Sequence, residues 1–354
     1  MKKFFRNSFL LFNLLAIAGL LVSYLAVKVS PASWSVPAFF GLAYPYFLLA
    51  NILFILFWLF VKTPFALLSF LTIALGYNHL TRYFQFAGSE TKDDGIQLYS
   101  YNVKNFYGEE DLQRKEVAAH ILNFLKEKQP DILCLQEVNL YKQKSFPTRP
   151  KKDKESPFFR YVHVSKKGGQ TSYSRYPIIH KDEAHFEGSS NMILISDLKI
   201  DDDTLRLFNC HLQSYYFSDA DIKSLDSLSF NNQEESYQKV KYTGSKLKQA
   251  FIKRTVQAET LHQLISQSPH PVVICGDFND TPVSYTYHTV TQGLLDAFVQ
   301  SGTGIGNTYL GKLPSFRIDY ILHSPEYNSF NFHIDKVAYS DHYPISCVLI
   351  KNDQ

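Results

Sequence analysis

The run Val272-Val273-Ile274-Cys275-Gly276-Asp277-Phe278-Asn279-Asp280 constrains this chain more than any other stretch. Its four apolar residues predict a buried strand that runs into Gly276 and then presents Asp277 and Asn279 on one face. A carboxylate that can orient or deprotonate water, beside an amide that can donate to a developing oxyanion, suits hydrolysis of a charged ester. The same run also fits a strand that ends in an ordinary Asp/Asn turn, so its meaning depends on whether the pattern recurs.

The pattern does recur, because several other predicted strands deliver a polar or ionisable side chain at or beside one end. Alone, each has a structural explanation, such as a turn-forming Asn, a surface Glu or a structural His. These residues are Asn102, Glu137, His211, Asp319, Asp341 and His342. Together with the Asp277 strand they predict one shared site.

The residue types favour phosphate chemistry. The carboxylates of Glu137 and Asp341 can hold a hard divalent ion, Mg²⁺ or Mn²⁺, with several waters retained. A histidine beside an Asp, with a second Asp to hold its other nitrogen, is a typical way to fix an imidazole. A metal would polarise the phosphoryl oxygen, Asp277 would direct water, and imidazoles and amides would meet the charge on the phosphoryl oxygens.

The first 88 residues predict a membrane segment with three transmembrane helices, at about 9–27, 38–61 and 65–80. A cleaved signal peptide is the alternative for the first run, but that run is long and two more follow it. Basic residues at positions 2, 3 and 6 favour a cytoplasmic N-terminus, so three crossings predict a multi-pass protein of the cell membrane with its remainder on the extracytoplasmic face. If the third run only lies in the interface, the remainder is cytoplasmic.

Charge is unevenly distributed along the chain. Residues 1–88 hold six of the 36 basic residues and no acidic ones, which leaves 30 basic against 33 acidic residues in the remainder. The remainder is therefore −3, and the basic pI is no argument that it binds nucleic acid. The four cysteines lie in apolar runs and are predicted to be buried, reduced core residues.

A polar linker, 89–95, leads into a predicted soluble domain, 96–350. Helical periodicity predicts helices over 112–128 and 247–266, and a polar insertion is expected at 214–244 on the rim of the site. Arg175, before a predicted strand, and Tyr215, at the start of the insertion, are the candidate substrate contacts.

Seven short motifs occur in an order that resembles the endonuclease/exonuclease/phosphatase superfamily, which includes deoxyribonucleases and sphingomyelinases. The chain is similar to a membrane-anchored, bacterial-type member, and the resemblance covers roughly residues 95–350. The motifs are Tyr-Asn-Val (101–103), Leu-Gln-Glu-Val (135–138), Ser-Arg-Tyr-Pro-Ile (174–178), Cys-His-Leu (210–212), Gly-Asp-Phe-Asn (276–279), Arg-Ile-Asp-Tyr-Ile (317–321) and Ser-Asp-His-Tyr-Pro (340–344).

The resemblance implies a role for each motif residue. Glu137 would be the principal metal ligand, with Asn102 and Asp341 close to it. Asp277 would position the attacking water, and Asn279 would bind the phosphate. His342, oriented by Asp319, would contact the scissile phosphate, and His211 would be the second histidine.

The implied fold is a four-layered α/β/β/α sandwich, in which two mixed β-sheets are flanked by helices. The implied function is a membrane-anchored, divalent-metal-dependent phosphoester hydrolase, a phosphodiesterase, nuclease or phosphatase. Its partners would be the lipid bilayer and a phosphoester in a nucleic acid, a phospholipid headgroup or a small molecule; no protein partner is implied. The alternative is a catalytically silent, membrane-anchored binding or scaffold module that keeps the fold.

Overall fold

The computed structural model describes residues 2–91, 93–108, 112–138, 159–215, 217–226, 233–311 and 316–352. The chain forms two compact units. The larger unit comprises Phe84–Ser214, Thr260–Asn279 and Val290–Gln354, and the smaller unit comprises Met1–Tyr83, Tyr215–Glu259 and Asp280–Thr289. Residues far apart in the sequence therefore contribute to each unit.

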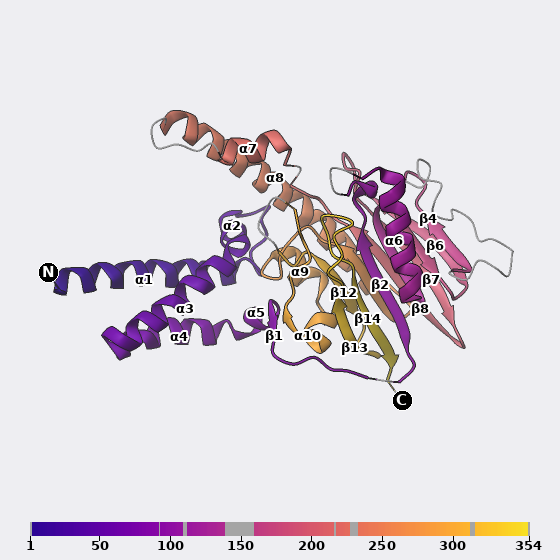
Figure 1. Ribbon diagram of the computed structural model, residues 1–354, viewed down its shortest axis with the longest axis horizontal. Helices are drawn as coiled ribbons and strands as arrows, with labels where there is room; N and C mark the ends of the chain where they lie inside the picture. Colours follow the sequence, from indigo (N-terminus) through magenta and orange to yellow (C-terminus); the bar gives the residue numbers. More distant parts are fainter. Residues whose placement is uncertain are drawn as a thin grey trace. The chain divides into compact units, whose positions relative to one another are not determined.

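Two six-stranded sheets form the larger unit (Figure 1). The first sheet contains β2 (Ile96–Asn102), β3 (Ile132–Val138), β4 (Tyr161–Val164), β5 (Gly169–Ser174), β13 (Tyr327–Ile334) and β14 (Ile345–Lys351). The second contains β6 (Ile178–His185), β7 (Met192–Ile200), β8 (Asp203–His211), β9 (Val272–Asp277), β10 (Leu295–Asp296) and β12 (Asp319–His323). A separate short pair joins β1 (Phe84–Gln85) to β11 (Gly304–Ile305).

Both sheets are mixed, as the fold prediction requires. The first has the strand order β13-β14-β2-β3-β5-β4, and the second has the order β10-β12-β9-β8-β7-β6. In each sheet one central pair is parallel, β2 with β3 and β8 with β9. Because parallel strands end at the same edge of a sheet, each pair brings the residues at its two carboxyl ends together.

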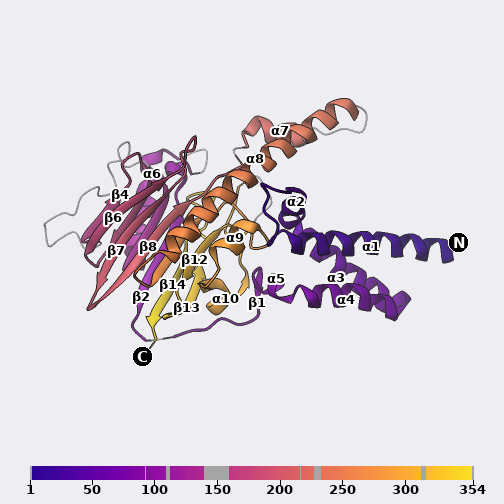
Figure 2. The ribbon, with the colours of Figure 1, turned by 180° about the vertical axis from the view of Figure 1, so that it is seen from behind.

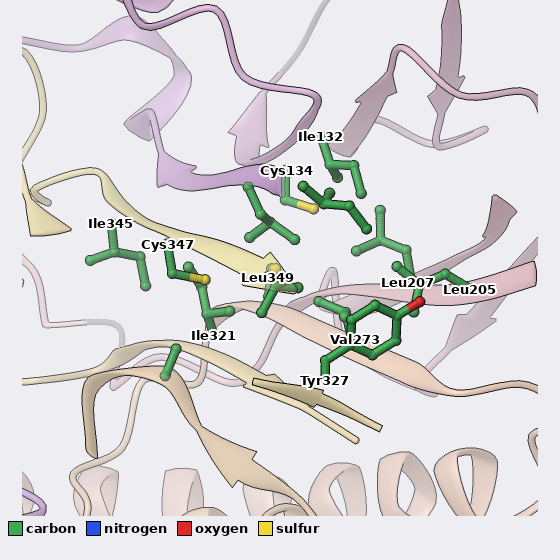
Figure 3. Packing of buried hydrophobic residues seen from close by; sticks show 14 of the residues in the cluster. Ile132, Cys134, Leu205, Leu207, Val273, Ile321, Tyr327, Ile345, Cys347 and Leu349 are labelled. Atoms are coloured by element: carbon green, nitrogen blue, oxygen red, sulfur yellow. The ribbon is translucent and has the colours of Figure 1, made fainter. Parts of the chain in front are cut away.

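The main core lies between the two sheets (Figure 3). Alternate residues of the strands point inward, and full burial of each Leu, Ile or Val stabilises the fold by roughly 1.5–3 kcal/mol. The residues labelled in Figure 3 are Ile132, Cys134, Leu205, Leu207, Val273, Ile321, Tyr327, Ile345, Cys347 and Leu349. All four cysteines are buried and unpaired by disulfides, which confirms that they are reduced core residues.

Helix α6 (Arg114–Lys128) covers the outer face of the first sheet (Figure 1). Its buried residues Val117, Ile121 and Leu125 recur every fourth position and pack in one cluster with side chains of β2 and β3. The Gln113 backbone N–H donates to the Glu116 carboxylate at 3.0 Å where the helix begins. The helix ends at Gln129, which is left-handed (φ 48°).

The end of α8 (Gln233–Ser266), from Thr260 onward, belongs to the same unit, with Leu261 and Ile265 buried. Figure 2 shows this part of the helix over the outer face of the second sheet. Two sheets with helices outside both confirm the predicted sandwich. The short helices η2 (Lys104–Phe106) and α10 (Ala297–Ser301) complete the unit.

The smaller unit is helical. Its elements are α1 (Lys2–Leu25), α2 (Val36–Leu42), α3 (Tyr44–Val61), η1 (Thr63–Phe65), α4 (Ala66–Leu75), α5 (Tyr77–Thr81), α7 (Asp219–Asp226), the first part of α8 and most of α9 (Tyr285–Val290). Two of these helices, over Phe4–Leu25 and Tyr44–Val61, are long and apolar enough to cross a membrane.

The predicted membrane runs differ in detail from these helices. The run 38–61 is divided between α2 and α3 at Ala43, and the third run forms the shorter α4 followed by α5. At 1.5 Å per residue, the ten residues of α4 extend only about 15 Å, about half the hydrocarbon thickness of a bilayer.

The predicted insertion 214–244 is largely helical where the structure describes it. Helix α8 begins at Gln233, well before the predicted start at Leu247. Acidic residues in its first turn stabilise the helix by interacting with the positive end of its dipole. The Glu235–Lys239 ion pair at 2.6 Å links successive turns. From Gln233 onward, the predicted insertion and the predicted helix 247–266 therefore form one helix, α8.

Candidate active site

The end of β9 holds Asp277 in a fixed position. Gly276, with φ 145°, pairs with Cys210 of the parallel strand β8, and a Cβ at this position would lie 1.9 Å from the Cys210 carbonyl oxygen. Only glycine allows this close approach. After the turn, the Asn279 backbone N–H donates to Asp277 Oδ1 at 2.7 Å and its side-chain Nδ2 donates to Asp277 Oδ2 at 3.1 Å.

The first sheet contributes Asn102 and Glu137 from the ends of β2 and β3. The pairing register shifts between Gln136 and Val138, and Glu137 has φ 49°. Such a bulge re-aims a side chain at a sheet edge. Asn102 Nδ2 lies 3.2 Å from Glu137 Oε1 and 3.0 Å from Asp277 Oδ2, so one amide connects the acids of the two sheets.

His342 is held from behind by a carboxylate. Its Nδ1 lies 2.9 Å from Asp319 Oδ2, which also accepts from Thr308 Oγ1 at 2.6 Å. Its Nε2 lies 3.7 Å from Asp277 Oδ2. Because Nδ1–H donates to Asp319, the ring is fixed with Nε2 facing Asp277.

His211 approaches that point from the end of β8. Its Nε2 lies 3.5 Å from Glu137 Oε1 and 3.8 Å from Asp277 Oδ2. This buried nitrogen has no hydrogen-bond partner within the described residues. A buried polar atom without a partner calls for an explanation, and a bound substrate or water would satisfy it.

Burial and neighbouring charges set the protonation states of Asp277 and His342. Burial raises the pKa of Asp277 to about 6, although His342 and His211 act in the opposite direction. Burial disfavours the charged form of His342, but the carboxylates of Asp319 and Asp277 outweigh it and raise the pKa of His342 to about 10. At neutral pH the pair therefore consists of a carboxylate that can accept a proton and an imidazolium that can donate one.

The donor set fits a divalent cation. Ligand atoms of Asp277, Asp319 and His342 lie within 4.8 Å of one another. Since Asp319 Oδ2 already accepts two hydrogen bonds, Glu137 offers the freer carboxylate oxygens, and its side chain is one-third exposed. Carboxylate and amide oxygens are the ligands that Mg²⁺ prefers.

Asp341 lies beside this group. Its Oδ2 forms an ion pair with Lys104 Nζ at 2.8 Å, and the Lys104 backbone N–H donates to Asn102 Oδ1 at 3.0 Å. The hydroxyl of Ser340 donates to the Asn102 carbonyl at 2.8 Å. The last motif is thereby fastened to the end of β2.

Arg175, predicted to contact substrate, lies away from Glu137, and its substrate role stays a prediction. Arg175 follows β5, which is antiparallel to β3, so it lies near the start of β3, whereas Glu137 lies near the other end. Its guanidinium pairs with Asp131 at 2.9 Å. Six residues of strand separate Asp131 from Glu137, roughly 20 Å.

The second predicted substrate contact, Tyr215, belongs to the smaller unit. The Arg254 guanidinium lies 4.5 Å from the centre of its ring. A substrate role for Tyr215 stays a prediction.

Three residues near the site did not stand out in the sequence: Lys104, Thr308 and Tyr309. The ring of Tyr309 lies 5.3 Å from that of His342, in an edge-to-face arrangement. Thr308 and Tyr309 lie in a Gly-rich loop, where no periodic pattern indicates which side chains point to the site. Lys104 follows the Asn102 motif directly, and that proximity was the one available signal.

An α/β sandwich with acids, amides and imidazoles gathered at one edge defines the class of metal-dependent phosphoester hydrolases. The Endonuclease/Exonuclease/phosphatase family matches residues 99–342, and the chain belongs to this family. Its enzymes hydrolyse phosphoesters with a divalent metal, which identifies the class of reaction. Residues 2–83 match a second family, described as a domain of unknown function (DUF8431).

Solved structures share the fold. TDP2 of D. rerio, complexed with a single-strand DNA product, is 18% identical with a TM-score of 0.50, covering 73% of this chain and all of that one. A humanized D. rerio TDP2 is 18% identical with a TM-score of 0.51, covering 72% and 99%. At this identity the likeness concerns the fold alone. A search of curated proteins found no match.

Proposed function

We propose that this protein is a membrane-anchored, Mg²⁺-dependent phosphoester hydrolase whose site is formed by the ends of β2, β3, β8, β9 and β12. The observation that carries the proposal is the convergence of Asn102 and Glu137 from one sheet with Asp277 from the other, within hydrogen-bond distance. Residues 175 positions apart in the sequence meet there because both sheets direct strand ends to the same edge.

Glu137 and Asn102 would hold the cation, with Asp341 as the third ligand. Mg²⁺ is the best fit and Mn²⁺ the second, because the donors are oxygens. When bound, the ion polarises a phosphoryl oxygen and offsets the charge that develops during attack. Lys104, paired with Asp341, adds a positive charge at the same edge.

The protein side chains would move the protons. Asp277 accepts a proton from the attacking water while the oxygen of that water forms a bond to phosphorus. The P–O bond to the leaving group then breaks, and His342 Nε2–H meets the charge on the departing or equatorial oxygens. Asp319 holds the imidazole through Nδ1. Asn279 Nδ2 donates to Asp277 Oδ2 and to the Leu212 carbonyl, and it would bind the phosphate by exchanging the second of these bonds. His211 Nε2 would meet the phosphate between Glu137 and Asp277.

Membrane anchoring is supported by inverted polarity in the helices of the smaller unit. Large apolar side chains such as Phe12, Leu53 and Phe60 face outward, whereas Asn13, Asn51 and Ser69 are fully buried. The buried groups satisfy each other: Asn13 Nδ2 donates to Ser69 Oγ at 2.7 Å, and Ser69 Oγ donates to Asn51 Oδ1 at 2.8 Å. Polar residues inside and apolar residues outside are typical of helices in a bilayer.

Helix direction favours three crossings, the third made by η1, α4 and α5 together. The Tyr24 hydroxyl, at the end of α1, donates to the Thr72 carbonyl near the end of α4 at 3.0 Å, so both helices end on the same side. The opposite side carries four basic residues, at positions 2, 3, 6 and 62, against Lys28 and Arg82 on this one. By the positive-inside rule, the chain after α5 then lies outside the cytoplasm.

The candidate substrates are phosphoesters of three kinds: nucleic acid, a phospholipid headgroup and a small phosphoester. The remainder beyond residue 88 carries a net −3, which gives a nuclease little electrostatic help. The outer position and the membrane helices favour an ester in or near the envelope.

The test is hydrolysis by the full chain in detergent with Mg²⁺, against bis-p-nitrophenyl phosphate, plasmid DNA and sphingomyelin. Asp277→Asn is expected to lower turnover at least about 100-fold. Asp131→Asn, at the far end of β3, is the matched control and retains activity. Equal turnover by Asp277→Asn and the parent would contradict the role of Asp277, and no turnover of any phosphoester would favour the silent scaffold instead.

A further inference from the structure

The smaller unit contains a helical arm that has no role in the hydrolase site described above. We call it the α7–α8 arm; it consists of α7 and of residues 233–250 of α8. Asp221 Oδ2 and Lys246 Nζ join the two helices as an ion pair at 2.7 Å, and the Ser218 hydroxyl donates to the same oxygen at 2.7 Å. Figures 1 and 2 both show the arm extending past α2 toward the side where α1 begins.

One face of α8 is buried at the base of the arm and open along it. The face is defined by residues that recur at alternating spacings of three and four positions. Its buried members in the smaller unit are Phe251, Arg254 and Ala258. The same spacing continues toward the start of the helix through Leu247, Gly244, Val240 and Tyr237.

We call Tyr237, Val240, Gly244 and Leu247 the open stripe. Tyr237 is 60% exposed and Val240 is 53% exposed, and a Cβ at Gly244 would meet nothing within 4 Å. Helix α7 does not cover the stripe, because its partner Lys246 lies two residues after Gly244, which is about 200° around the helix. The open stripe is therefore exposed on the side of α8 that faces away from α7.

The base of the arm contacts α2, which lies between the two proposed membrane crossings α1 and α3. The Phe251 ring meets the Phe39 ring of α2 edge-on, with centroids 5.2 Å apart. Helix α2 has seven residues, about 10 Å, so it is too short to cross and lies where the chain turns back at one surface of the bilayer. The open stripe continues the face that carries Phe251, so it is directed to the same surface beside α2.

Charged and aromatic side chains suit this face to an anionic lipid surface. Lys241 and Lys248 flank the open stripe and are exposed. A tyrosine such as Tyr237 is typical of the boundary between headgroups and acyl chains. A second copy of the chain is a poorer match, because in a parallel helix pair these lysines would face Ser236 and Thr243, which supply no negative charge.

We propose that the open stripe binds the anionic surface of the membrane that α1 and α3 cross. Tyr237 and Val240 enter the boundary between headgroups and acyl chains, and Lys241 and Lys248 pair with headgroup phosphates. The contact holds the arm against the bilayer at a second place besides the crossing helices. This inference rests on the proposed membrane anchoring.

The experiment measures lipid contact in the full chain, reconstituted at one copy per nanodisc in phosphatidylcholine with phosphatidylglycerol. The four native cysteines are buried, so a thiol-reactive fluorophore labels only a cysteine introduced at the surface. Val240→Cys places the label on the open stripe. Gln238→Cys, two residues earlier and roughly on the opposite face of α8, is the matched control.

Lipids that carry a nitroxide quencher in the headgroup report contact. We expect them to quench the label at position 240 more strongly than the label at position 238. In the Val240→Cys background, Lys241→Gln combined with Lys248→Gln is expected to lower the ratio of lipid-bound to unbound arms at least about fivefold. Lys253→Gln removes an exposed lysine from the other face of α8 and leaves the quenching unchanged.

Equal quenching of the two labels would overturn the proposal, as would unchanged quenching in the double lysine variant. If the label at position 240 is shielded only when two copies share a nanodisc, the open stripe binds a second copy and the proposal is also wrong.

Failure of the membrane anchoring is detected separately. Phe12→Cys places a label on α1, where Phe12 is 60% exposed, and lipids with the nitroxide in the acyl chain report its contact. Quenching at position 12 without quenching at position 240 would reject the arm contact alone, whereas no quenching at position 12 would reject the anchoring. Turnover of bis-p-nitrophenyl phosphate, measured on the same samples, tests the hydrolase site independently.

Discussion

Left-handed backbone conformations gather around the active site at the level of single residues. Glu137 and Asn279 have φ near 50°, and three successive residues, 104–106, have φ of 46°, 50° and 62°. Each costs of order 1–3 kcal/mol in a residue other than glycine, yet they occur at the ends of strands whose side chains meet at Asp277. The surrounding packing thus holds these residues in strained backbone conformations and keeps the site side chains in fixed positions. Stabilising a charged transition state requires such preorganised groups.

Asp319 is the residue whose role is easiest to isolate. Asp319→Asn keeps the side-chain volume but removes the charge that raises the pKa of His342. Turnover is expected to fall about 100-fold, and the alkaline limb of the pH–rate profile should move to lower pH because His342 loses its proton more easily.

The measurement is kcat against pH with bis-p-nitrophenyl phosphate. Asp335→Asn, which breaks a pairing with Lys128 elsewhere, serves as the control. A profile for Asp319→Asn that coincides with the parent's would show that Asp319 does not position His342.

At the level of elements, the close approach of β8 and β9 depends on Gly276. In Gly276→Ala the new Cβ would meet the Cys210 carbonyl at 1.9 Å at a φ of 145°. We expect a loss of more than about 3 kcal/mol, seen as a Tm lower by roughly 5–10 °C. Gly244→Ala, where a Cβ meets nothing within 4 Å, should leave Tm unchanged or higher. Equal Tm values for both variants would contradict the packing of the two strands.

A second link between elements is sensitive to pH. His163 Nδ1 lies 2.8 Å from Ser196 Oγ and joins β4 of one sheet to β7 of the other. Burial, with Lys181 nearby, lowers the pKa of His163 to about 4. Since the unfolded chain binds this proton near pH 6.5, His163 favours folding above that pH, and this contribution is lost as pH falls from 6.5 to 4.

The loss amounts to at most about 3 kcal/mol. Tm measured from pH 7.5 to 4.5 should fall less steeply in His163→Gln than in the parent. Parallel Tm curves for the two proteins would mean that His163 is not buried in its neutral form.

The elements also show where sequence reasoning succeeds. Alternating strands that end in Asn102, Glu137, His211 and Asp277 could be predicted because period-two burial and terminal polar residues are local signals. The position of Arg175 could not be predicted, because its motif carries no signal of strand direction; the antiparallel pairing of β5 with β3 places it at the other end of β3 from Glu137.

For the whole molecule, each of the two compact units combines segments from both sides of the predicted boundary at residue 88. Residues 215–259 and 280–289 group with the N-terminal helices, and Val283 is fully buried in their cluster. A Cβ at position 41 would lie 2.3 Å from the Val283 carbonyl oxygen, so only glycine fits there. Such long-range packing leaves no periodic trace in the sequence, so the helices could not be recognised as more than a tether.

The central claim is that Glu137 and Asn102, brought beside Asp277 by two different sheets, hold the divalent cation of a phosphoester hydrolase. The most direct measurement is turnover of bis-p-nitrophenyl phosphate by the full chain against Mg²⁺ concentration, for the parent and Glu137→Gln, with Glu183→Gln as the control. The account predicts that Glu137→Gln needs at least about tenfold more Mg²⁺ for half-maximal turnover, while Glu183→Gln does not. The same Mg²⁺ dependence in Glu137→Gln and the parent would contradict it.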